Sequence, residues 1–161
     1  MSSEPPLIRE IRSSETHLIR QSVLRPHQAV AEMDFAGDHL EGTFHLGAFV
    51  GEQLVSIGSF YPESNQAVPE GVQYRLRFMA TMPAFSRLGI GRALLEKGAT
   101  RLTERNVDVL WCHARRSAVL FYVAVGFAAL GAEFAIPNIG PHSLMLRQIR
   151  ASYASSLTVA S

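Results

Sequence analysis

The sequence predicts a mixed α/β or α+β fold, and three observations lead to that class. The chain has 161 residues, which is enough for one substantial core and too short for two ordinary domains. Hydrophobic types make up 47% and charged types 18%, a balance typical of a folded globular protein. Hydrophobic patterns predict, in order, a strand, a helical region, three strands, a long helix, a strand, a short helix and two strands. We therefore expect a single domain over residues 1–150 and a small, polar tail over 151–161.

The first half of the chain is expected to form four strands and one helical region. Ser13 or Ser14, with Glu15 behind it, is suited to cap a helix that runs towards Leu24 and is interrupted by Pro26. Alternating side chains predict the strands, and a turn at Gly51 and Glu52 joins the second to the third. A polar loop over residues 62–71 precedes the fourth. The expected strands are 7–12, 43–50, 54–61 and 73–81.

The second half is expected to begin with an amphipathic helix. Pro83 prevents the preceding strand from simply continuing. One helical face then carries Ile90, Leu94, Leu95, Gly98 and Leu102. After it we expect a buried strand at 107–114, a short apolar helix from Ser117 to Gly126, and two strands at 127–136 and 143–149. Core packing is the simplest interpretation of three further residues, Trp111, Cys112 and Phe121.

Composition excludes several classes of function. The net charge of +1 and the scattered arginines provide no stripe for nucleic acid. The N-terminus has no signal-peptide pattern and no apolar run reaches the length of a membrane span, so we expect a cytoplasmic protein. The single Cys112 cannot form an intramolecular disulfide. The six histidines show no metal-ligand spacing, so no metal is expected.

Two glycines stand where the fourth strand turns into the long helix. Gly89 and Gly91 let a ligand approach the backbone, and the free N–H groups of a first helical turn favour a phosphate. A dinucleotide fingerprint needs a third glycine where this chain has Leu94, and a P-loop needs Gly-Lys-Ser/Thr where it has Gly91-Arg92-Ala93. The glycines therefore predict either an anion site of another type or only a tight connection.

The surrounding pattern resembles the GNAT (N-acetyltransferase) superfamily. The strand ends Met79-Ala-Thr-Met-Pro83, the turn is Ser86-Arg-Leu-Gly-Ile-Gly91, and Ala118-Val-Leu-Phe-Tyr-Val-Ala-Val-Gly-Phe127 follows. Ser86 stands where the family has Gln or Arg, and Arg115 where many relatives have Asn. The resemblance implies a mostly antiparallel central sheet flanked by helices, with acetyl-CoA as co-substrate. By resemblance, the residues that bind this coenzyme are Met79, Ala80, Thr81, Arg87, Leu88, Gly89, Ile90, Gly91, Arg92 and Ala118.

The resemblance also implies a mechanism. The acceptor amine would attack the thioester directly, a strand N–H near Met79 would stabilise the oxyanion, and Tyr122 would protonate the departing thiolate as catalytic acid. The base stays open, and the candidates from the residues are His45, Glu63, Glu133 and His142. His142 is the most suggestive, in an expected Gly140-Pro-His-Ser turn.

Other questions stay open at this point. Arg115 and Arg116 would either reach coenzyme A phosphates or form solvated surface. The acceptor is expected to be a small-molecule or peptide amine, without nucleic acid or membrane partners, and a homodimer is plausible by family habit. The alternative function is a non-catalytic acyl-CoA binding or sensing module on the same fold.

Overall fold

The computed structural model describes residues 4–151 and residue 153. These residues form two compact units, and each is considered by itself. The first contains residues 4–62 and 76–100, and the second contains 63–75 and 101–151 with 153. Strand β4 (Gln73–Thr81) and helix α2 (Ile90–Glu104) each run from one unit into the other along the chain.

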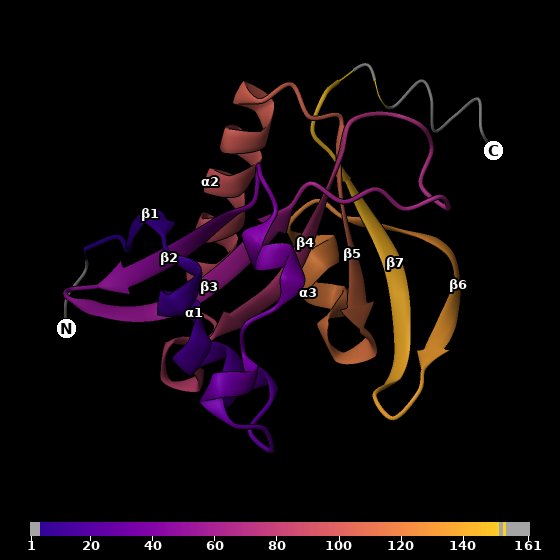
Figure 1. The fold of residues 1–161 in the computed structure, drawn as a ribbon. Coiled ribbons are helices and arrows are strands. Elements are labelled where there is room, and N and C mark those ends of the chain that lie inside the picture. The colour runs from indigo at the N-terminus through magenta and orange to yellow at the C-terminus, as the bar shows by residue number, and fades with distance from the viewer. Residues whose placement is uncertain (1–3, 152, 154–161) are drawn as a thin grey trace. The chain divides into compact units, whose positions relative to one another are not determined.

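Seven strands are hydrogen-bonded in the order β1-β2-β3-β4-β5-β7-β6 (Figure 1). The pairs β1–β2, β2–β3, β5–β7 and β6–β7 are antiparallel, and β4–β5 is parallel. The predicted mixed, mostly antiparallel sheet is therefore confirmed. The strands besides β4 are β1 (Leu7–Ile11), β2 (Phe44–Val50), β3 (Gln53–Tyr61), β5 (Val109–Arg115), β6 (Ala128–Ile136) and β7 (Gly140–Gln148).

The helical region of the first unit begins where it was predicted, but it does not continue as one regular helix. Helix α1 (Ser13–Ile19) continues into a π-helical turn, η1 (Arg20–Leu24), and the chain leaves the helix before Pro26. The expected cap at Ser13 or Ser14 was wrong, because both residues lie inside α1. The cap is Arg12, whose backbone N–H donates to the Glu15 carboxylate at 3.4 Å. Two short 3-10 turns follow, η2 (Val30–Glu32) and η3 (Ala36–His39).

Helix α2 covers the first unit's sheet with the face that its pattern predicts. Ile90, Leu94 and Leu95 are buried there. Gly98 allows a close approach, because a Cβ atom at this position would lie 2.4 Å from Cζ of Phe60 on β3. The glycine thus sets how closely this helix packs on the strand.

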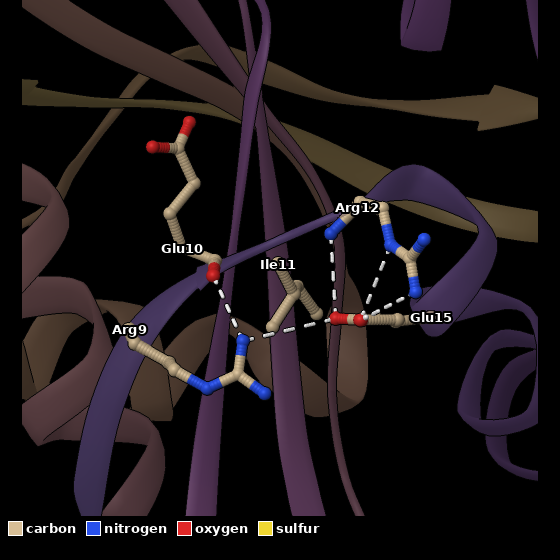
Figure 2. A pocket seen from close by; sticks show the side chains of 5 residues that line it. All are labelled: Arg9, Glu10, Ile11, Arg12 and Glu15. Carbon is tan, nitrogen blue, oxygen red and sulfur yellow. Dashed lines mark hydrogen bonds and ion pairs between the residues drawn. The ribbon is translucent and has the colours of Figure 1, made fainter.

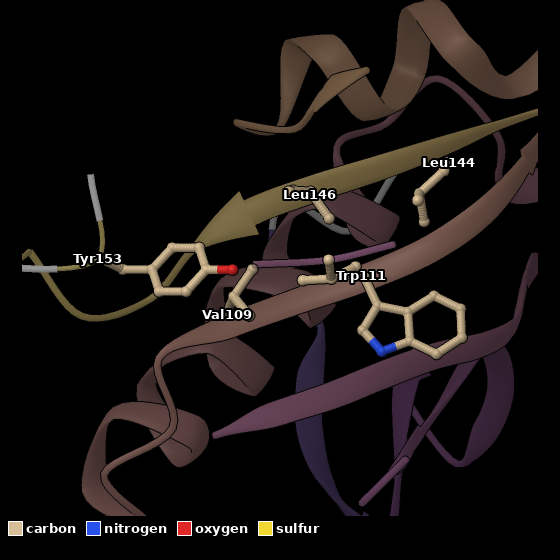
Figure 3. Close-up of a cluster of buried hydrophobic side chains, with 6 residues drawn as sticks. Val109, Trp111, Leu144, Leu146 and Tyr153 are labelled. Atoms are coloured by element: carbon tan, nitrogen blue, oxygen red, sulfur yellow. The ribbon is translucent and has the colours of Figure 1, made fainter. Parts of the chain in front are cut away.

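The second unit has a core of its own, shown in Figure 3. Val109 and Trp111 of β5 pack with Leu144 and Leu146 of β7 and with Tyr153. Tyr153 is only 3% exposed, and its hydroxyl donates to the Pro69 carbonyl at 2.6 Å. One residue of the predicted tail therefore belongs to this core, while residues 154–161 lie outside the described part of the chain.

Two expectations about the second unit were wrong. Gly140–Ser143 is not a turn but the start of β7, and the turn lies at residues 137–139. Pro141 pairs with Ala135 of β6, but on the other side the pairing of β7 with β5 ends at His142. No acceptor on β5 therefore needs the N–H that proline lacks, and the strand tolerates Pro141. Phe121 is not a core residue, since it is 37% exposed on helix α3 (Val119–Ala124).

Among the residues that the structure describes, no helix combines the length and apolar character that crossing a bilayer requires.

Candidate functional site

The predicted coenzyme turn lies in the first unit, after β4 and a single 3-10 turn (Pro83–Phe85). Arg87 and Gly89 both have left-handed backbones, with φ of +62° and +79°. A Cβ atom at Gly89 would have no heavy atom of the described residues within 4 Å, so this glycine is required by its φ rather than by crowding. The turn is open to an incoming ligand.

The start of α2 provides hydrogen-bond donors at this turn. The Ala93 N–H donates to the Gly89 carbonyl at 3.0 Å, closing the first helical turn. The amides of Ile90, Gly91 and Arg92 come before it and have no acceptor within the helix. Arg87, Leu88 and Arg92 are exposed around them, whereas Ile90 and Gly91 are buried. Free amides, the positive end of the helix dipole and two guanidinium groups favour an anionic ligand.

Strand β4 is irregular shortly before the residues predicted to bind the coenzyme arm. Phe78 has a φ of +55°, which is unusual for a side chain of this size inside a strand. The parallel pairs with β5 run only from Gln73 to Arg75. The next residues are Met79, Ala80 and Thr81, and the last two contact the Ser56 hydroxyl at 3.2 Å and 2.8 Å.

Tyr122, the predicted catalytic acid, lies in the second unit on α3. Its ring meets the rings of Phe121 and Phe127 edge-on, each at 5.2 Å between centroids. It is 9% exposed, and burial raises the pKa of its phenol, so the hydroxyl keeps its proton at neutral pH. Ala118, a predicted coenzyme contact, ends a 3-10 turn (Arg116–Ala118) directly before α3.

The core interpretation of Trp111 and Cys112 is confirmed, since both are 2% exposed on β5. Burial raises the pKa of the Cys112 thiol to about 12. It is thus an inert structural residue at neutral pH.

Two of the four candidate bases are carboxylates held in ion pairs. Glu63 accepts a hydrogen bond from Arg75 at 2.9 Å. The exposed Glu133 pairs with Arg116, whose hydrogen bonds lower the pKa of this carboxyl. Arg116 therefore has a partner of its own chain, while Arg115 is exposed at the end of β5. The contact with Arg116 makes Glu133 a weaker base.

The other two candidate bases are buried histidines. Burial lowers the pKa of His45, so this imidazole is neutral at neutral pH. Its Nδ1 contacts the Ser59 hydroxyl at 2.7 Å, and its buried Nε2 has no hydrogen-bond partner among the described residues. His142 is 5% exposed on β7, and its Nδ1 contacts the Gly140 carbonyl at 2.9 Å. His45 thus combines a neutral ring with a buried nitrogen that lies 3.8 Å from Oδ1 of Asp38.

A buried polar network in the first unit was missed by sequence reasoning. Arg20 is completely buried and its guanidinium donates to both oxygens of Asp38 at 2.7 and 2.8 Å. Further bonds join Arg20 to Ser59 at 2.9 Å and the Tyr61 hydroxyl to Asp38 at 2.6 Å. Burial by itself would raise the pKa of Asp38, but the hydrogen bonds from Arg20 and Tyr61 outweigh it and lower that pKa to about 2.

One group of possible metal ligands lies beside this network. Ligand atoms of His17, Asp34 and Asp38 lie within 4.8 Å of one another. The Asp38 oxygens are already taken by the Arg20 guanidinium, and the Asp34 carboxylate contacts His39 at 2.8 Å. A metal ion would have to compete with a fixed positive charge, so these residues fit a cation poorly.

Figure 2 shows a separate surface pocket of about 510 Å³ at the end of β1, lined by Arg9, Glu10, Ile11, Arg12 and Glu15. Glu15 pairs with Arg12 at 3.3 Å and with Arg9 at 4.0 Å. The charges that line this pocket therefore largely satisfy one another.

The fold and the turn together define a protein with a mixed sheet and, after an irregular strand, a helix N-terminus that is suited to an anion. Residues 15–140 match the acetyltransferase (GNAT) domain family. The chain is 38% identical over 145 residues to the uncharacterized N-acetyltransferase YitI of Bacillus subtilis (strain 168), covering 90% of this chain and 97% of that relative. This chain belongs to the GNAT family and is an acetyltransferase of that type.

Solved structures show the same fold at low sequence identity. FeeM, an N-acyl amino acid synthase from uncultured soil microbes, superposes with a TM-score of 0.74 at 14% identity, covering 96% of both chains. An aminoglycoside 6'-N-acetyltransferase in complex with coenzyme A gives 0.72 at 11% identity, covering 89% of this chain and 97% of that one. The ribosomal-protein-S18-alanine N-acetyltransferase of Escherichia coli gives 0.69 at 19% identity, covering 90% and 94%.

Proposed function

We propose that this protein transfers the acetyl group of acetyl-CoA to an amine of a small molecule or peptide. The amine nitrogen attacks the thioester carbonyl, the new C–N bond forms and the C–S bond breaks. The amine loses a proton to a base, and the coenzyme leaves as a thiolate that takes up a proton. This reaction needs no covalent enzyme intermediate and no metal.

The observation that carries the proposal is the turn from Arg87 to Arg92. Its left-handed residues lead into amides of the first turn of α2 that have no acceptor within the helix, and this arrangement suits the pyrophosphate of coenzyme A. Arg87 and Arg92 add charge on either side. The edge of Met79–Thr81 is suited to pair with the extended pantetheine arm, as a sheet edge does with an extended ligand.

Two groups would then act on the reacting atoms. The Met79 N–H would donate to the developing oxyanion, as preorganised donors do in acyl transfer. The Tyr122 hydroxyl, kept protonated by its raised pKa, would donate to the leaving thiolate. We assign no base among His45, Glu63, Glu133 and His142. We place this reaction in the cytoplasm, without a nucleic acid or membrane partner. The reaction is compatible with a homodimer.

Calorimetry with coenzyme A tests the turn directly. Arg87→Gln and Arg92→Gln each remove one charge from an exposed side chain, so the fold should persist while the affinity falls roughly tenfold. Lys97→Gln is the matched control, because Lys97 is exposed on the same helix but lies beyond its first turn. Unchanged affinity in both arginine variants would contradict the coenzyme site. Release of free thiol from acetyl-CoA across an amine library tests turnover.

A further inference from the structure

The ring of Phe78 is buried in the first unit against a second ring and a buried cation. Its centroid lies 4.5 Å from that of Phe35. The Arg20 guanidinium lies over the Phe78 ring, 4.3 Å from the centroid, and the half-buried Arg77 of the same strand lies over it at 4.5 Å. A guanidinium attracts an aromatic face in this geometry, and the attraction is stronger where water is excluded. Arg20 is the neighbour of this ring that is both charged and fully buried.

The Arg20 guanidinium is itself held in place. It donates to the Met33 carbonyl at 2.8 Å, to both Asp38 oxygens at 2.7 and 2.8 Å, and to the Ser59 hydroxyl at 2.9 Å. These bonds reach three other segments of the chain, so the guanidinium plane has little freedom to turn. A buried ion pair is weak evidence for stability, because apolar side chains of similar volume often serve as well. A rigid plane over Phe78 is a role that apolar side chains would not supply.

The backbone of Phe78 is unusual in a way that these contacts explain. Its φ of +55° is rare for a bulky residue. Such a conformation persists where the surroundings enforce it, and it is frequent at functional sites. Packing of the ring against Phe35 and Arg20 provides that enforcement. The peptide group that carries the Met79 N–H is attached directly to the Cα atom of Phe78, so the backbone angles of Phe78 decide where this N–H points.

We propose that Arg20 is a positioning residue for acetyl transfer. By fixing the Phe78 ring, it keeps the left-handed backbone of Phe78 and so aims the Met79 N–H at the developing oxyanion. This inference rests on the proposed acetyl transfer. A donor that is already oriented needs no rearrangement when the charge develops, whereas a small misplacement can cost a large part of the rate.

Two variants separate the parts of this arrangement. Arg20→Lys keeps a positive charge opposite Asp38 but has no planar group to lie over the ring. Phe78→Leu removes the ring and leaves the pair of Arg20 and Asp38 in place. Gly98→Ala controls for a general loss of stability, because its new Cβ would crowd Phe60 rather than Phe78. Urea unfolding establishes which of the variants are folded.

The first measurement follows the Met79 amide without any substrate. Selective ¹⁵N labelling of the five methionines simplifies the amide spectrum, and the signal that is lost in Met79→Leu is that of Met79. Arg20→Lys should shift this signal more than Gly98→Ala does. The Met145 signal, from β7 of the second unit, should stay in place in both variants. A Met79 signal that does not move in folded Arg20→Lys would overturn the inference.

The second measurement separates kcat from coenzyme binding. With an amine that wild type acetylates, Arg20→Lys and Phe78→Leu should each lose roughly 10- to 100-fold in kcat, less than or equal to the loss of a whole oxyanion donor. Their calorimetric affinity for coenzyme A should stay close to that of wild type, because coenzyme A has no acetyl carbonyl for this N–H to contact. Gly98→Ala should keep its kcat.

The outcomes distinguish this inference from the function on which it rests. If wild type does not bind coenzyme A or acetylates no amine, the proposed acetyl transfer fails, while the Met79 signal still reports whether Arg20 orients that amide. If wild type is active but kcat is unchanged in folded Arg20→Lys, Arg20 has no positioning role. Should Arg20→Lys fail to fold, Phe78→Leu decides the question by the same kcat comparison.

Discussion

Replacing Asp38 with Asn should destabilise the protein in a way that depends on pH. The carboxylate faces the fully buried Arg20 guanidinium at 2.7 Å, and the substitution leaves that cation without a counter-charge. Breaking a buried pair from one side typically costs about 3–5 kcal/mol. We expect a loss of that order in the free energy of unfolding at neutral pH.

The pH dependence has a definite sign. The pKa of Asp38 falls from 3.8 to about 2 on folding, almost two units. At roughly 1.4 kcal/mol a unit, the ionised group contributes about 2 kcal/mol of pH-dependent stability. Because the folded pKa lies below the unfolded one, this contribution is complete above about pH 4 and disappears as the pH falls towards 2.

Urea unfolding of wild type and Asp38→Asn from about pH 7 down to about pH 2.5 measures both effects. The difference in free energy of unfolding between the two proteins should shrink over that range, by most of the pH-dependent contribution of Asp38. Asp34→Asn is the control. The Asp34 carboxylate is exposed, and among the interactions described it contacts only the exposed His39. This substitution should change the free energy of unfolding by no more than about 1 kcal/mol. The reasoning is refuted if the free energies of unfolding of wild type and Asp38→Asn differ little, or if they differ equally at the highest and the lowest pH of this range.

Two further predictions concern the packing of α2 and the role of Tyr122. Gly98→Ala should lower the free energy of unfolding by roughly 1–3 kcal/mol, although Ala has the better helix propensity, because the new Cβ would lie 2.4 Å from the buried Phe60 ring. An unchanged or higher melting temperature would contradict this expectation. Tyr122→Phe should keep the ring contacts and the coenzyme A affinity of the wild type but lose roughly 10²- to 10⁴-fold in kcat. If the variant turns over as fast as the wild type, Tyr122 has no part in the mechanism.

Local patterns were sufficient to predict most elements of the fold. Strand β4 was predicted with its observed ends, and the buried face of α2 follows from helical spacing alone. The Gly140-Pro141 pair was misinterpreted because its local signal is that of a turn. Its true setting depends on which neighbouring strand reaches Pro141, and that is decided by the register of the sheet.

The candidate site was predicted unevenly for the same reason. The turn from Arg87 to Gly91 has a contiguous motif, so its residues could be named from the sequence. The contact between Arg20 and Asp38 joins two helical turns 18 residues apart, and Tyr61 comes from strand β3, so no periodic pattern connects them. Only the tertiary arrangement reveals them.

Tyr153 has a practical consequence for anyone who shortens this chain. A version that stops at Arg150 would look harmless from its sequence, since only small and polar residues surround the aromatic one. It would nevertheless leave a ring-sized hole beside Val109 and deprive the Pro69 carbonyl of its donor. Recombinant versions intended for crystallisation should therefore keep the C-terminus at least through Tyr153, and purification tags are better placed beyond it than in its stead.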